Sequence, residues 1–141
     1  MKIYIASRLE NYLQVQALRD ALVAAGHVIT YDWTLHGSVQ GQGEARLRQV
    51  ATNELNGVRD ADLVVVLLPG GRGTHAELGM ANVLGKPVIL FSDSDDPFDV
   101  YLGATCAFYW NQNVYQLVVH HNRPENVIPS LIRHRFMEVS A

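Results

Sequence analysis

In the first part of the chain, the pattern of hydrophobic residues is typical of a strand, then of a helix, and then of a strand again. Residues 2–6 are rich in residues that favour a strand. Across residues 11–25 apolar residues recur every three or four positions, which predicts an amphipathic helix. Gly26 is expected to end this helix in the left-handed conformation, and residues 27–33 then form a second predicted strand.

The remainder of the chain repeats this alternation. Residues 62–68 form a continuous apolar run, which is typical of a strand covered on both faces. Pro124 and Pro129 indicate an extended C-terminal tail over residues 124–141. The other predicted elements are a mobile loop at 35–43, a helix at 44–59, a turn at 69–73, a helix ending near 85–87, strands at 88–91 and 106–110, and a short helix at 114–120.

Strands that alternate with helices predict a parallel sheet with right-handed crossovers. We therefore expect one α/β domain spanning residues 1–141, a doubly wound five-stranded parallel sheet of order 2-1-3-4-5 with helices on both faces. Ligands bind such sheets beyond the carboxyl ends of the strands, where the winding reverses. In this order the reversal brings residues 4–11 and 69–77 together, so the site is predicted there.

Composition narrows the possible partners. A net charge of −3 gives no indication of a nucleic-acid partner, and the longest apolar run, residues 63–68, is too short to cross a membrane. Residues 1–6 resemble a strand rather than a signal peptide, and the single Cys106 suits a reducing compartment, so we expect a cytoplasmic protein. His120, His121 and His134 lack partners at metal-ligand spacing, so no metal is expected.

A glycine-rich turn leads into the third predicted helix. Gly71 and Gly73 allow the backbone to approach a ligand closely, and the free N–H groups of a helix N-terminus favour an anion. Arg72 adds a positive charge suited to a carboxylate or phosphate. Glu77 follows within the same helix. We expect it in the first turn of this helix, where it would stay ionised and could attack an electrophilic sugar carbon.

Two other interpretations use the same residues. Thr74 and Glu77 have the spacing of a capping box, in which Glu77 would only bind the Thr74 amide. Gly71, Gly73 and Ala76 also fit a dinucleotide-binding fingerprint, with Asp93 at the distance of a ribose-binding acid. That fingerprint normally follows the first strand, whereas this turn follows the third. A nucleotide-binding module without covalent chemistry is therefore the alternative to an enzyme.

The chain resembles the nucleoside 2-deoxyribosyltransferase family, which includes 2′-deoxynucleoside 5′-phosphate N-hydrolases. The resemblance runs from Lys2 to about Trp110. It implies that Glu77 attacks the anomeric carbon, that Tyr4 positions Glu77, and that Glu54, at a position where the family usually has Asp, handles the leaving base. A second base or water then accepts the sugar, and no cofactor is required. The matching segments are Ile3-Tyr4-Ile5-Ala6-Ser7, Glu54-Leu55-Asn56-Gly57-Val58, Ala61-Asp62, Gly73-Thr74-His75-Ala76-Glu77-Leu78-Gly79 and Gly85-Lys86-Pro87-Val88.

The resemblance also bears on the substrate and on assembly. The transferases have an acid where this chain has Gly71 and Arg72, which favours an anionic sugar substituent such as a 5′-phosphate, with Ser7 and Arg8 facing it. Alternatively, Arg72 is an exposed residue at a loop tip. The family implies a homodimer or higher oligomer with shared active sites, in which Asp99 is the nearest match to the residue that reaches the neighbouring site.

Three further residues have both a functional and a structural interpretation. His75 could donate a hydrogen bond to the substrate, or it could simply be exposed. Asp32 and Trp33 end the second predicted strand and could line the base pocket, with Trp33 stacking on the nucleobase. Packing in the core or at its rim is the alternative for this pair.

Overall fold

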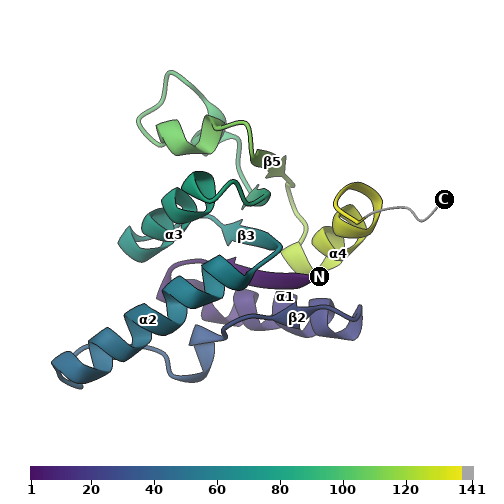
Figure 1. Cartoon of the computed structure of the whole chain (residues 1–141). Helices are drawn as coiled ribbons and strands as arrows, with labels where there is room; N and C mark the ends of the chain where they lie inside the picture. The colour runs from purple at the N-terminus through teal and green to yellow at the C-terminus, as the bar shows by residue number, and fades with distance from the viewer. Residues whose placement is uncertain (138–141) are drawn as a thin grey trace.

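A computed structural model describes residues 1–137. Its five strands form one parallel sheet in the order β2-β1-β3-β4-β5, as the sequence predicts (Figure 1). The strands are β1 (Lys2–Ala6), β2 (Val28–Ile29), β3 (Leu63–Leu67), β4 (Val88–Ser92) and β5 (Val114–Val118). The helices are α1 (Tyr12–Ala24), α2 (Glu44–Asp60), α3 (Arg72–Val83) and α4 (Pro124–Arg135), with short 3-10 turns η1 (Leu9–Asn11), η2 (Trp33–Leu35), η3 (Asp96–Phe98) and η4 (Ala107–Trp110).

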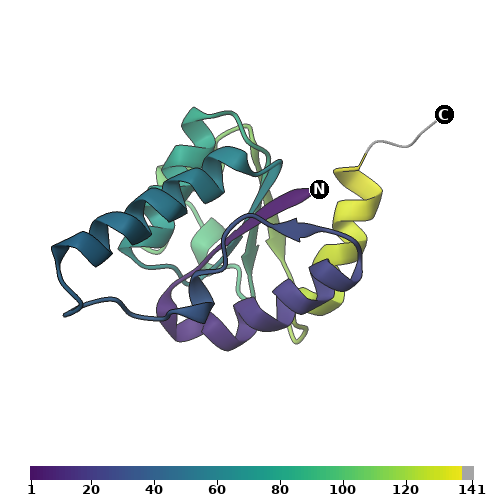
Figure 2. The ribbon, with the colours of Figure 1, turned by 60° about the horizontal axis from the view of Figure 1, so that its bottom comes forward.

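Helices cover both faces of the sheet. α1 packs beside α4 on one face, and α2 packs beside α3 on the other (Figure 2). Because β3 and β4 lie between these layers, every residue of both strands is buried, which accounts for their unbroken apolar runs. No helix within residues 1–137 has the length and apolar character needed to cross a membrane.

The second strand is shorter than predicted. Only Val28–Ile29 pairs with β1, and the chain then leaves the sheet. Asp32 caps the η2 turn by accepting a hydrogen bond from the Thr34 N–H at 3.0 Å. This local bond turns the chain away from the sheet, and Trp33 therefore begins a 3-10 turn instead of ending a strand. Gly26 does take the predicted left-handed conformation, with φ of +93°.

The predictions for the C-terminal third of the chain were wrong in three places. Residues 107–110 form the η4 turn, and the predicted short helix at 114–120 is instead strand β5. Val114–Val118 pairs with β4 along its length, and its β-branched and aromatic residues suit a half-buried edge strand.

The predicted tail also contains a helix. Pro124 is compatible with helix α4 because it lies in the first turn, where its missing N–H would have no helical partner. Ile128 and Ile132, four residues apart, bury that helix against the core. Residues 138–141 of the tail lie outside the described part of the chain.

Candidate active site

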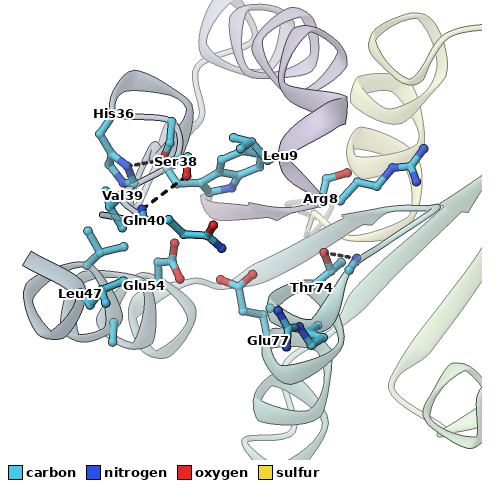
Figure 3. Close-up of a pocket in the computed structure, with 18 of the residues that line it drawn as sticks. Arg8, Leu9, His36, Ser38, Val39, Gln40, Leu47, Glu54, Thr74 and Glu77 are labelled. Carbon is cyan, nitrogen blue, oxygen red and sulfur yellow. Dashed lines mark hydrogen bonds between the residues drawn. The ribbon is translucent and has the colours of Figure 1, made fainter. Parts of the chain in front are cut away.

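A cavity of about 550 Å³ lies beyond the carboxyl ends of β1 and β3, where the strand order reverses (Figure 3). The β1–α1 connection, the segment after β2, one face of α2 and the N-terminus of α3 form its walls. This is the position that the doubly wound topology predicts for a ligand. The lining residues are 7–10, 33, 36–40, 47, 50, 51, 54, 71–74 and 77.

Glu77 is the buried carboxylate of this cavity. Its side chain is 7% exposed, and the phenol of Tyr4 donates a hydrogen bond to its Oε2 atom. Tyr4 is itself completely buried on β1, with its ring against α2 at Gly57. A Cβ atom at Gly57 would lie 2.9 Å from the Tyr4 ring, so a larger residue there would displace the ring. Three elements therefore fix the orientation of the Glu77 carboxylate.

The protonation of Glu77 differs from the sequence-based expectation. Burial raises its pKa to about 8, the Tyr4 hydrogen bond lowers the pKa, and the charge of Glu54 raises it again. Glu77 is the sixth residue of α3, in the second helical turn, whereas the stabilising field of a helix N-terminus is largely confined to the first. The prediction that the helix keeps this carboxylate ionised was wrong, because desolvation outweighs the dipole.

The capping-box interpretation of Glu77 was also wrong. Gly71 is the N-cap of α3, and its backbone N–H donates to Thr74 Oγ1 at 3.0 Å. Thr74 is thus the third residue of the helix and closes the turn itself. Glu77 contributes nothing to this cap, so its carboxylate stays directed into the cavity (Figure 3).

Glu54 lies on α2 across the cavity from Glu77. The two carboxylates point toward the same space (Figure 3). Partial burial raises the pKa of Glu54, and the nearby His36 lowers it. A carboxyl group with a raised pKa holds a proton more readily near neutral pH, which suits a proton donor to a leaving group. Thus the residues implied as nucleophile, positioning group and acid come together at one site.

Of the two residues predicted to line a base pocket, one lies in the cavity. Trp33 lines the cavity, and its indole N–H donates to the Ile5 carbonyl at 2.9 Å, which anchors the ring to β1. Asp32 is not part of the lining. Its carboxylate instead accepts a hydrogen bond from Arg19 at 2.7 Å.

His75 and Asp99 are also placed outside the cavity lining. The Nδ1 atom of His75 lies 2.8 Å from the Gly71 carbonyl, and its Nε2 atom lies 2.7 Å from the Tyr109 hydroxyl. Both ring nitrogens are therefore occupied, one at the start of α3 and the other in joining α3 to η4. Asp99 accepts a hydrogen bond from the Tyr101 N–H at 2.9 Å, in the connection after β4.

The segment 36–40, which was predicted only to be part of a loop, also lines the cavity. His36, Ser38, Val39 and Gln40 all line the cavity. The Gln40 side chain points into it, toward the space between the two carboxylates (Figure 3). Polar, glycine-rich composition directly after a strand beside the switch point was the available signal.

The end of the cavity near α3 collects the predicted anion-binding residues. Ser7, Arg8 and residues 71–74 all line it. Ser7 Oγ donates to the Leu67 carbonyl at 2.8 Å and accepts from Asn11 at 2.9 Å, so its role is to hold the loop in place. Arg72 is exposed and makes no side-chain hydrogen bond or ion pair within the described residues. It is therefore available to bind a ligand.

The residues of the dinucleotide fingerprint do not form a second site of their own. The turn follows β3, and Asp93, after β4, lines other cavities than the one that contains Gly71 and Gly73. Across residues 1–137 no three His, Cys, Asp or Glu side chains are grouped so that they could hold a metal ion.

Comparisons with known proteins identify related chains. The sequence model of the family described as nucleoside 2-deoxyribosyltransferase matches residues 3–127. The structure of a Clostridium botulinum CMP N-glycosidase, BcmB, superposes with a TM-score of 0.63 at 16% identity, covering 94% of this chain and 99% of that one. A 2-deoxyribosyltransferase from Bacillus psychrosaccharolyticus superposes with a TM-score of 0.57 at 28% identity, covering 67% of this chain and 74% of that one. No curated protein sequence matches the chain.

Proposed function

We propose, because this chain belongs to the nucleoside 2-deoxyribosyltransferase family, that it cleaves the N-glycosidic bond of a deoxynucleoside or its 5′-monophosphate through a covalent intermediate on Glu77. The observation that carries this proposal is the pair of carboxylates, Glu77 and Glu54, that point into one cavity. Tyr4 orients Glu77 for the reaction.

The first step requires the ionised form of Glu77, which burial makes the minor form near neutral pH, and an oxygen of this carboxylate attacks the anomeric carbon of the sugar. A bond forms between this oxygen and the carbon, and the bond from the carbon to the base nitrogen breaks with its electron pair leaving on the base. Protonated Glu54 gives its proton to the departing base, so that the base leaves as a neutral molecule and not as a poorly stabilised anion.

In the second step, Glu54 is a carboxylate and accepts a proton from an incoming water or from the N–H of a second base. That nucleophile attacks the anomeric carbon from the face the first base left, and the ester bond to Glu77 breaks. The two displacements retain the configuration of the sugar. Glu77 forms and releases the bond to the sugar, and Glu54 supplies and takes up the proton. The reaction therefore requires no cofactor.

The site chemistry favours a 5′-phosphate on the substrate. Arg72 lies at the N-terminus of α3, where backbone N–H groups and a guanidinium can act together on an anion. We expect Arg72→Ala to lower the specificity for the 5′-monophosphate about 10- to 150-fold and to leave the free nucleoside unaffected. Arg48→Ala, an equal loss of charge at an exposed position of α2 outside the cavity, is the control.

The test of the proposed function is a substrate panel. Each common deoxynucleoside and ribonucleoside, with and without a 5′-phosphate, is incubated with the protein in the presence or absence of a second free base, and the products are separated by chromatography. Release of free base supports the proposal, and the second base distinguishes transfer from hydrolysis. Turnover of free nucleosides equal to that of the 5′-monophosphates, with Arg72→Ala silent, would contradict the phosphate specificity and leave Arg72 a surface residue.

We also propose that the protein is a homodimer or higher oligomer with shared active sites. Large apolar residues are exposed on the single chain, among them Val83 at 88% and Tyr101 at 94%. Tyr101 lies beside Asp99, in the connection between β4 and β5 that was expected to reach a neighbouring site. Light scattering at micromolar concentration is expected to give at least twice the chain mass, and an active monomer would refute this proposal.

A further inference from the structure

A second cavity, of about 270 Å³, lies along the same edge of the sheet. It is formed by the start of α1, the ends of β3 and β4, and the connection from β5 to α4. Arg8 lines both this cavity and the catalytic one. In Figure 3 the Arg8 side chain extends away from Glu77, toward α4. The two cavities are therefore neighbours that share a guanidinium.

The second cavity is lined by two guanidinium groups and one carboxylate. Arg8 and Arg123 each have only a distant ion pair within the described residues, at 4.0 Å to Glu10 and to Glu125. Asp93 is the carboxylate of the lining, and it is not within ion-pair distance of either arginine. Since each guanidinium has five N–H donors, most of the donors around this cavity are free to bind an anion.

The amide side chains of Asn11 and Gln14 also line the cavity, but within the described residues only that of Gln14 has free N–H donors. The Asn11 amide group is held in place by its hydrogen bonds to Ser7 Oγ at 2.9 Å and to the Pro69 carbonyl at 3.0 Å. Gln14, one helical turn further along α1, also lines the cavity. Its amide forms no side-chain hydrogen bond within residues 1–137 and remains available to a ligand.

We propose that this cavity binds a phosphate group beyond the 5′-phosphate, so that the protein takes a nucleoside 5′-diphosphate with its second phosphate between Arg8 and Arg123. Each guanidinium group can donate two parallel hydrogen bonds to phosphate oxygens, and the two positive charges outnumber the single negative charge of Asp93. The shared position of Arg8 lets one ligand continue from the catalytic cavity into the second. The placement of the nucleoside rests on the proposed function, whereas the anion site rests on the second cavity alone.

The first experiment uses inorganic pyrophosphate, which tests the anion site without any nucleoside. Isothermal titration calorimetry compares the wild type with Arg123→Ala and with Arg133→Ala, an equal loss of charge at an exposed position of α4, the helix that Arg123 precedes. We expect Arg123→Ala to weaken binding about tenfold or more and Arg133→Ala to leave it unchanged. Absent binding, or equal binding in the wild type and Arg123→Ala, would overturn the proposal.

The second experiment measures binding of deoxynucleoside 5′-mono- and 5′-diphosphates to the Glu77→Gln protein, in which turnover is prevented. The diphosphate is expected to bind about tenfold more tightly than the monophosphate, and adding Arg123→Ala should remove that difference. Equal affinity for the two would overturn the diphosphate inference. If pyrophosphate binds through Arg123 but no nucleotide binds, the proposed function fails and the anion site is retained.

Discussion

Glu77→Gln is expected to lower the rate of base release at least about a thousand-fold while the protein remains folded. An amide cannot act as the nucleophile, but it keeps the size of the side chain and can accept the Tyr4 hydrogen bond in place of the carboxylate. The rate is measured by chromatography on the best substrate of the panel, and folding by circular dichroism.

Glu44→Gln is the matched control for this loss of a carboxylate. Glu44 is exposed at the start of α2 and lies outside the cavity, so its variant should keep full activity. The rate of the truncated variant Glu77→Ala decides whether Glu77 is the nucleophile. If that variant keeps a tenth or more of the wild-type rate, Glu77 is not the nucleophile, and the nucleotide-binding module becomes the better description of the site.

The free energy of unfolding is expected to fall by about 3 kcal/mol between about pH 5 and pH 8 because of Glu77 alone. The folded pKa of about 8 lies above the ordinary value of 4.5, so the native state holds this proton more tightly than the unfolded chain does. The stabilisation is complete below the unfolded pKa and is lost as the pH rises through the folded one.

Urea unfolding of the wild type and Glu77→Gln across this pH range, at one protein concentration, measures the effect. The Glu54 pKa is raised as well and contributes a slope of the same sign in both proteins, so the difference between the two curves reports the titration of Glu77 together with its interaction with Glu54. The variant should therefore be the more stable protein at pH 8. Parallel curves would show that Glu77 is already ionised in the folded state and would contradict its desolvation.

The central part of the fold was predictable from local patterns. The apolar runs of β3 and β4 indicate strands covered on both faces, and their alternation with helices gives the strand order and the position of the site. The last third was not predictable in this way. β5 is an edge strand whose pairing with β4 is a long-range contact, and Pro129 lies inside α4, where proline is normally unfavourable.

The candidate site, like the fold, was only partly predictable from the sequence. The sequence identifies Glu77 and, through the family resemblance, relates it to Tyr4 and Glu54. It does not reveal that burial raises the Glu77 pKa, because desolvation depends on contacts between three separate elements. Nor does it predict that Gln40 points into the cavity or that Asp32 turns away toward Arg19, since both depend on the path of the chain after a short β2.

The covalent intermediate can be tested directly by acid quench and peptide mass spectrometry. The protein is mixed with the best substrate and quenched during turnover, in the wild type and in Glu54→Gln, which lacks both the acid of the first step and the base of the second. We expect a mass increase of one sugar unit, esterified to the peptide at Glu77 and absent from Glu77→Gln. An adduct on a different residue, or steady turnover by Glu54→Gln with no adduct at all, would contradict it.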